Sequence, residues 1–316
     1  MKDATRILRR HPANPLLHVK DYPGIAQLYN PAPVQHNDET LLLVSVVEHA
    51  AKRGYGRDVG QTRIARSKDG VHFTLGTGNF IDVQSEAHPW SLYHHFIDNR
   101  VTKIGDTYYI VTPVMVHGFV SPLGMLGRTR DFVTYERMDT ITLPPNRGAS
   151  LFSEKINGKY WKLDRPGGGS VRGDIWISSS PDLLHWGGYQ PLLAANYRFW
   201  NTDKIGPTPP IKTDKGWLVI IHGVFTPAGG TYYYIGAMLL DLNEPWKIIG
   251  KTNSYLLGPE EEYEKHGNCD NTVFPCGAIA DAAKDELRLY YGACDNYICL
   301  ATGSLSEVVQ ACIGEI

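Results

Sequence analysis

The sequence predicts an all-β protein, built as a five-bladed β-propeller. A strand-rich unit recurs five times along the chain, and its spacing of about 40–50 residues is typical of propeller blades. The 316 residues include 32 glycines and 20 prolines, which interrupt helical periodicity throughout. A β-sandwich is the structural alternative. It accounts for alternating strands but not for five similar units.

The most recognisable part of the unit is an aliphatic strand that ends in small or charged residues. Its copies lie at 62–73, 126–132, 175–186, 235–242 and 298–305. A hairpin precedes each copy, with turns at Asn37–Thr40, Gly105–Thr107, Asn157–Lys159, Asp214–Gly216 and Lys284–Glu286. Asx and glycine residues between aromatic and β-branched runs are expected in β-hairpins. We therefore assign residues 1–316 to a single propeller domain, with 1–23 as an N-terminal extension.

The overall charge excludes some classes of partner. There are 31 basic and 33 acidic residues, a net charge of -2, which gives no reason to expect a nucleic-acid or acidic-lipid surface. No run of about 18 apolar residues exists, so a membrane span is not expected. Residues 1–6 carry charges without an apolar stretch behind them, unlike a secretory signal.

The cysteines favour a reduced, cytoplasmic protein. Their number is odd, all lie in the last fifth of the chain, and no pair has C-x-x-C spacing. This pattern is a poor disulfide framework and a poor zinc site, so we expect free thiols, no metal and no cofactor. The five residues are Cys269, Cys276, Cys294, Cys299 and Cys312.

A propeller places the first strand of every blade along the central channel, so residues at the strand ends converge. The first strands are predicted to begin near Asn30, Asp98, Arg147, Lys204 and Asn271. The second strands are predicted to end near Glu48, His117, Arg165, His222 and Asp295. The repeat alone therefore predicts a polar pocket that holds acids and bases together.

Several of these residues suit a particular chemistry. Asp98 lies between apolar residues and close to Arg100, which suits a proton donor, a structural ion pair with Arg100 or a turn cap. Arg147 and Arg165 lie at opposite ends of one hairpin and could bind an anion such as phosphate. Alternatively, Arg165 pairs with Asp164 or with another acid.

The remaining candidates are less specific. Lys204, His222 and Tyr233 could be satisfied polar groups at strand positions. No phosphate-binding P-loop, G-x-S-x-G or H-E-x-x-H motif occurs, so nucleotide hydrolysis, serine esterase chemistry and zinc protease chemistry lose support.

Six segments together resemble glycoside hydrolase family 130, which contains β-mannoside phosphorylases and related β-mannosidases. The resemblance runs in order from about Asn30 to Val309. The segments are Asp98–Ile104, Leu151–Tyr160, Lys204–Gly206, Trp217–Val224, Asn271–Gly277 and Tyr290–Asp295. The family fold is a five-bladed propeller, in agreement with the repeat.

The resemblance implies roles for the candidate residues. Asp98 matches the general acid, and Arg147 and Arg165 match phosphate-binding arginines. Lys204, Tyr233 and His222 are assigned to phosphate as well. The residues assigned to the sugar substrate are Asn30, Arg100, Asn271 and Asp295. The chain has Ile97–Arg100 where the family often has Glu-Asp-Pro-Arg, which leaves the substrate linkage, β-1,2 or β-1,4, open.

The resulting hypothesis is inverting phosphorolysis of a β-mannoside, with inorganic phosphate as co-substrate and α-mannose 1-phosphate as product. One alternative is a β-mannosidase, which needs a carboxylate such as Glu48 or Asp164 to activate water. The other is a propeller that binds sugar without catalysis. The expected partners are a mannosyl oligosaccharide and phosphate, and a homo-oligomer is possible.

Overall fold

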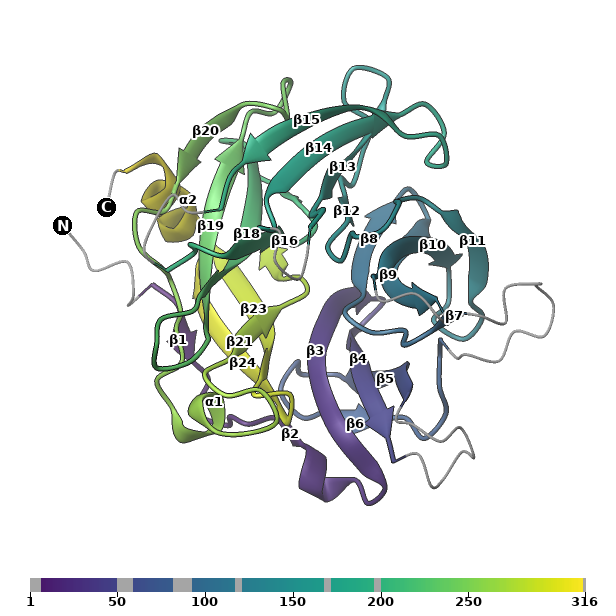
Figure 1. Ribbon diagram of the computed structural model, residues 1–316, viewed down its shortest axis with the longest axis vertical. Coiled ribbons are helices and arrows are strands. Elements are labelled where there is room, and N and C mark those ends of the chain that lie inside the picture. The colour runs from purple at the N-terminus through teal and green to yellow at the C-terminus, as the bar shows by residue number, and fades with distance from the viewer. Residues whose placement is uncertain are drawn as a thin grey trace.

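The structure is a computed structural model that describes residues 7–49, 59–81, 93–116, 121–167, 172–195 and 200–314. In this part of the chain the strands form five antiparallel sheets, which stand around a common centre (Figure 1). The predicted five-bladed β-propeller is thereby confirmed. The described residues also form three short helices, which are η2 (Val19–Asp21), α1 (Glu262–Lys265) and α2 (Leu305–Ile313).

The first two sheets follow the predicted hairpin order. The first contains β3 (Ile25–His36), β4 (Glu39–Glu48), β5 (Val59–Ser67) and β6 (Thr74–Leu75). The second contains β7 (Tyr93–His94) and β8 (Arg100–Ile104), which both pair with β9 (Thr107–Val116), then β10 (Leu123–Thr129) and β11 (Glu136–Thr140).

The third and fourth sheets repeat this arrangement. The third contains β12 (Ser150–Leu151), β13 (Tyr160–Asp164), β14 (Ile175–Ser180) and β15 (Gly187–Leu193). The fourth contains β16 (Lys204–Pro207) and β17 (Ile211–Lys212), which pair with β18 (Trp217–Phe225), then β19 (Tyr232–Leu240) and β20 (Ile248–Lys251).

The fifth sheet joins the two ends of the chain. Its inner strands are β21 (Val273–Pro275), β22 (Ile279–Asp281), β23 (Glu286–Ala293) and β24 (Tyr297–Ser304). Its outer strands are β1 (Arg9–Arg10) and β2 (Leu17–His18), which pair with β24 through Arg9–Thr302 and Leu17–Ile298. Part of the segment that we expected to be an extension is therefore the outer edge of the last blade.

Strand β4 shows why the middle strands read as continuous apolar runs. Leu41 and Leu43 point into a cluster shared with the second blade, which includes Phe96. Leu42 and Val44 point into the opposite cluster, shared with the fifth blade. Because successive side chains of a strand face opposite sides of the sheet, a blade packed between two neighbours needs apolar residues at every position.

The first strands begin close to the predicted positions. Lys204 is the first residue of β16, and Asp98, Arg147 and Asn271 lie two or three residues before β8, β12 and β21. Asn30 lies within β3, where the register with β4 shifts between Tyr29 and Ala32. In the described residues, no helix is long and apolar enough to cross a membrane.

Candidate active site

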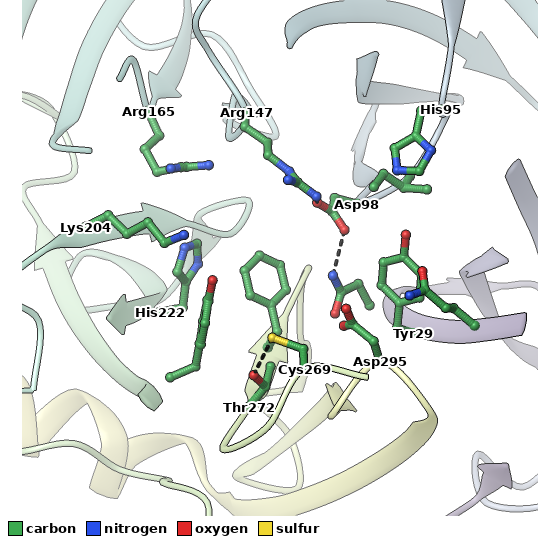
Figure 2. A pocket seen from close by; sticks show the side chains of 15 residues that line it. Tyr29, His95, Asp98, Arg147, Arg165, Lys204, His222, Cys269, Thr272 and Asp295 are labelled. Carbon is green, nitrogen blue, oxygen red and sulfur yellow. Dashed lines mark hydrogen bonds and ion pairs between the residues drawn. The ribbon is translucent and has the colours of Figure 1, made fainter. Parts of the chain in front are cut away.

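A cavity of about 310 Å³ lies where the first strands begin, and all five blades contribute to its wall (Figure 2). This volume is within the range of small-molecule sites. The lining residues are Gln27, Tyr29, Asn30, His95, Ile97, Asp98, Arg147, Arg165, Lys204, His222, Tyr233, Cys269, Thr272, Phe274 and Asp295.

Eight of the ten predicted site residues belong to this wall: Asn30, Asp98, Arg147, Arg165, Lys204, His222, Tyr233 and Asp295. Arg100 and Asn271 do not. The neighbour of Asn271, Thr272, lines the cavity in its place, while the Asn271 carbonyl accepts a hydrogen bond from the Tyr233 N–H (2.9 Å). His117, which we expected at a strand end, lies outside the described residues.

Arg100 supports the site from behind. It is buried, and its Nη1 donates to the Asp98 carbonyl (2.7 Å) and to Cys276 Sγ (2.8 Å). Its Nε donates to the Pro207 carbonyl at 3.3 Å. These contacts give Arg100 a structural role beneath Asp98, and the predicted direct contact with sugar has no support from its position.

The backbone of the site is held in an uncommon conformation. Asn30, Asp98, Asn271 and Asp295 have φ values of 47°, 56°, 54° and 56°, and His95 has 68°. Asn and Asp tolerate the left-handed region better than most residues, and such conformations cluster at functional sites. The Asn and Asp residues before the apolar strands therefore have two roles. They accommodate the positive φ, and they supply polar side chains.

The Asp98 carboxylate is buried and fully partnered. Asn30 Nδ2 donates to its Oδ1 at 2.7 Å. Arg147 Nε donates to its Oδ2 at 3.0 Å, and Arg147 Nη2 lies 2.8 Å from the same oxygen. Burial raises the pKa of Asp98, but the charges of Arg147 and Arg100 and the bond from Asn30 outweigh burial and hold it below its usual value. Asp98 is thus ionised in the free protein.

The opposite side of the cavity carries positive charge without an anion. Arg165 is 6% exposed, and its Nε has no hydrogen-bond partner among the described residues. Lys204 Nζ lies 5.2 Å from the centre of the Tyr233 ring. Burial and the nearby Arg147 lower the pKa of Arg165 to about 10. A buried donor with no partner is costly, so this end is suited to bind an anion.

His222 lies beside these cations in the cavity wall and is itself neutral. Burial and the charges of Arg165 and Arg100 hold the pKa of His222 well below its usual value. Its ring packs 4.4 Å from the Phe274 ring, and its buried Nδ1 has no hydrogen-bond partner in the described part of the chain. The imidazole can therefore offer a hydrogen bond to a ligand without adding charge.

The close approach of His222 and Arg165 to β16 depends on a glycine, Gly206. A Cβ atom on Gly206 would lie 2.3 Å from His222 Cε1 and 3.0 Å from Arg165 Cδ. Both side chains would have to move, because real Cβ contacts under 3.0 Å are essentially never seen. Gly206 was part of the segment that resembles the family, but its packing role was not visible in the sequence.

Asp295 is the second carboxylate in the wall. Burial and the charge of Asp98 raise its pKa to about 6, although Arg147 acts in the other direction. The carboxylates that we considered as hydrolytic bases lie elsewhere. Glu48 forms an ion pair with Arg63, and neither Glu48 nor Asp164 lines the cavity.

Asp164 is instead a buried structural acid. Lys162 Nζ and Asn146 Nδ2 donate to its Oδ1 at 2.6 and 3.1 Å, and Ser178 Oγ donates to its Oδ2 at 2.9 Å. The alternative in which Arg165 pairs with Asp164 is therefore wrong. Asp164 does not neutralise the positive charge of Arg165, which faces the cavity.

Seven lining residues were not predicted as site residues: Gln27, Tyr29, His95, Ile97, Cys269, Thr272 and Phe274. Most stand one to three residues from a predicted one, such as Tyr29 beside Asn30 and Ile97 beside Asp98. Left-handed residues break the simple alternation of strand side chains, so neighbouring residues can face the same cavity.

Comparison with known proteins agrees with this geometry. The family described as beta-1,4-mannooligosaccharide phosphorylase, glycoside hydrolase family 130, matches residues 5–313. The beta-1,4-mannooligosaccharide phosphorylase of Ruminococcus albus is 32% identical over 98% of this chain and 91% of its own length. The beta-1,2-mannobiose phosphorylase of Listeria innocua is 38% identical over 81% of this chain and 70% of its own.

A solved structure extends the agreement to the whole fold. Beta-1,2-mannobiose phosphorylase from Listeria innocua, in complex with beta-1,2-mannobiose, superimposes with a TM-score of 0.84 at 31% identity. The match covers 96% of this chain and 99% of that one. With the family match along nearly its entire length, this chain belongs to glycoside hydrolase family 130, the family of β-mannoside phosphorylases.

Proposed function

We propose that this protein cleaves β-mannosides with inorganic phosphate, inverts the anomeric centre, and releases α-mannose 1-phosphate and a shortened sugar. The observation that carries the proposal is the pair of cations, Arg165 and Lys204, that face the cavity without an anionic partner among the described residues. A phosphate dianion supplies the missing charge and accepts the parallel hydrogen bonds of a guanidinium group.

The chemistry needs one acid and no protein base. A phosphate oxygen attacks the anomeric carbon from the cationic side, and the bond to the leaving oxygen breaks on the opposite face. Asp98 gives a proton to that oxygen, directly or through a sugar hydroxyl. Phosphate is itself the nucleophile, so the second carboxylate of an inverting hydrolase is not required.

The hydrolytic alternative fits the cavity less well. A β-mannosidase needs a carboxylate to activate water, and among the described lining residues Asp295 is the carboxylate other than Asp98. Arg165 and Lys204 would then have no function in the reaction. A propeller that only binds sugar would need neither a buried acid nor the cations.

We propose a β-mannosyl disaccharide or oligosaccharide as the substrate. The relatives named above act on β-1,4-mannooligosaccharides and on β-1,2-mannobiose, so both linkages belong in the test. We also propose a cytoplasmic location, which is supported by five cysteines that are all free thiols.

The test is to incubate the protein with β-1,2-mannobiose, β-1,4-mannobiose and mannosyl-glucose, each with and without phosphate. Phosphorus NMR detects α-mannose 1-phosphate, and a coupled assay detects free mannose. We expect product only with phosphate, at a rate that saturates with phosphate concentration. Free mannose at full rate without phosphate would overturn the proposal and make Asp295 the base to test.

A further inference from the structure

We infer that Arg147 transfers from Asp98 to phosphate when phosphate binds, and that Asp98 then takes up the proton that it later gives to the leaving oxygen. Arg147 would thus be the residue that couples occupation of the anion site to loading of the acid. The inference rests on the proposed phosphorolysis and adds an order of events to it.

Arg147 has the position that this transfer requires. Figure 2 shows its side chain reaching from the side of Arg165 toward Asp98. Nε and Nη2 both contact Asp98 Oδ2, at 3.0 and 2.8 Å, so one carboxylate oxygen holds the guanidinium. The side chain is 46% exposed, which leaves it open to an incoming ligand.

Hydrogen bonds fix the backbone beside Arg147, whereas its guanidinium group contacts one carboxylate oxygen, Asp98 Oδ2. Asn146 Oδ1 accepts from the Arg165 N–H at 3.3 Å, and Asn146 Nδ2 donates to Asp164 at 3.1 Å. Among the described residues, the Arg147 guanidinium makes its polar contacts with Asp98. A phosphate held by Arg165 and Lys204 therefore competes for the guanidinium with one carboxylate oxygen.

The free state is not ready for acid catalysis. A carboxylate held by a guanidinium group stays ionised and has no proton to donate. When the guanidinium moves to phosphate, Asp98 loses a cation and gains a nearby anion, and both changes favour its protonated form. The proton goes to Oδ2, because Oδ1 keeps the hydrogen bond from Asn30.

The other charged groups around Asp98 cannot move from Asp98 to phosphate as Arg147 can. Arg100 is fixed by the Pro207 carbonyl and Cys276 Sγ, and Asp295 adds further negative charge above about pH 6. The titratable and charged groups that face Asp98 from the surrounding elements are Tyr29, His95, Arg100, Arg147, Cys276 and Asp295, with Arg165, Lys204, His222 and Tyr233 across the cavity.

The protons balance over a turnover. Hydrogen phosphate dianion binds and one proton from solvent protonates Asp98. In the reaction a phosphate oxygen bonds to the anomeric carbon, the glycosidic bond breaks, and Asp98 gives its proton to the leaving oxygen. The sugar phosphate monoanion then releases one proton to solvent, and Asp98 is again a carboxylate that Arg147 can bind.

The test is calorimetric titration of the protein with inorganic phosphate at pH 8, where free phosphate is mainly the dianion. Two buffers with very different ionisation enthalpies report the protons taken up per phosphate bound. We expect wild type to take up more protons than Asp98→Asn, by a difference that approaches about one proton per phosphate. Asp98→Asn should still bind phosphate.

Two further variants separate Arg147 from the rest of the anion site. Arg147→Ala and Arg165→Ala should both weaken phosphate binding. Only Arg147→Ala should abolish the proton uptake that depends on Asp98, because Arg165→Ala leaves the pair of Arg147 and Asp98 intact. If both variants keep that uptake, Arg147 is not the coupling residue and the inference fails.

The outcomes also distinguish this inference from the proposed function. Phosphate binding with equal proton uptake in wild type and Asp98→Asn would overturn the transfer and leave phosphorolysis standing. No phosphate binding in any variant or in wild type would overturn both proposals.

Discussion

Asp98 combines an uncommon backbone conformation with a buried, fully partnered carboxylate. Its φ of 56° and the hydrogen bond from its N–H to Ser45 Oγ (2.9 Å) fix the start of the strand, while its side chain meets Asn30 and Arg147. Asparagine accepts the same φ and has almost the same shape. Substitution by asparagine therefore removes the acidic group and leaves the backbone conformation unchanged.

We predict that Asp98→Asn keeps the fold and loses nearly all turnover. Removal of a general acid typically lowers the rate by about 100- to 10,000-fold. Steady-state kinetics with the active disaccharide and a thermal unfolding curve measure the two effects separately. A near-normal rate would exclude Asp98 as the acid.

At the cationic end we predict that Arg165→Ala raises the Michaelis constant for phosphate far more than that for sugar. A hydrogen bond to a charged group contributes about 1.5–3 kcal/mol. The buried Arg165 guanidinium faces the cavity with no hydrogen-bond partner for its Nε among the described residues. Arg130→Ala removes an exposed arginine outside the cavity and is the matched control. Equal losses of sugar and phosphate affinity in Arg165→Ala would contradict the assignment.

Asp295 makes the stability of the protein depend on pH. Its pKa of about 6 in the folded state lies above the ordinary value, so the folded protein holds this proton to higher pH than the unfolded chain does. The stabilising contribution of protonated Asp295 is present below the ordinary pKa and is lost as pH rises through about 6. Above that pH the ionised carboxylate is a cost to folding.

We therefore predict that Asp295→Asn is more stable than wild type at pH 7.5, by on the order of 1–3 kcal/mol, and not more stable at pH 4. Urea unfolding at the two pH values measures the difference. Asp106→Asn, in an exposed turn, should change stability little at either pH. A variant that is less stable than wild type at pH 7.5 would show that the Asp295 carboxylate is favourably partnered.

At the scale of elements, β1 is held to α1 by one buried charge pair. Arg10 Nε and Nη2 donate to the two oxygens of Glu264 at 2.8 Å each, and Tyr291 Oη donates to Glu264 Oε1 at 2.7 Å. Glu264 is fully buried. The Thr272 N–H donates to the Glu264 carbonyl at 2.9 Å, so the same residue fixes the segment that reaches the cavity.

We predict that Arg10→Ala lowers the free energy of unfolding by about 3–5 kcal/mol, because it leaves a buried carboxylate without its cation. Arg9→Ala, on the exposed neighbour in the same strand, should cost less than about 1 kcal/mol. Equal effects of the two substitutions in urea unfolding would show that the pair with Glu264 is not what holds β1.

The elements also show what could be predicted from the sequence. Hairpin turns and apolar strands are local patterns, so all five blades and the convergence of Asp98, Arg147 and Lys204 could be predicted. The pairing of Arg9 with Thr302 joins residues almost 300 positions apart, and no local pattern indicates it. The choice of Thr272 over Asn271 as a lining residue depends on the left-handed backbone, which composition and periodicity do not specify.

At the scale of the whole molecule, the ring closes through the fifth blade, where the first strands of the chain cover β24 (Figure 1). Leu8 and Leu17 bring the N-terminal segment into two different core clusters. The cavity takes residues from all five blades, so the relative positions of Asp98 and the cations depend on this closure.

We predict that deletion of residues 1–18 destabilises the protein and promotes association, whereas deletion of residues 1–6 does not. The longer deletion removes β1 and β2, exposes the outer edge of β24 and leaves apolar surface where Leu8 and Leu17 were buried. An uncovered strand edge pairs readily with other chains, and loss of a buried leucine side chain typically costs about 2–5 kcal/mol.

Soluble yield, thermal unfolding and size-exclusion chromatography measure the effects. The shorter deletion leaves both strands in place, so an equally stable, monodisperse protein from both deletions would show that the ring does not need the N-terminal strands to close.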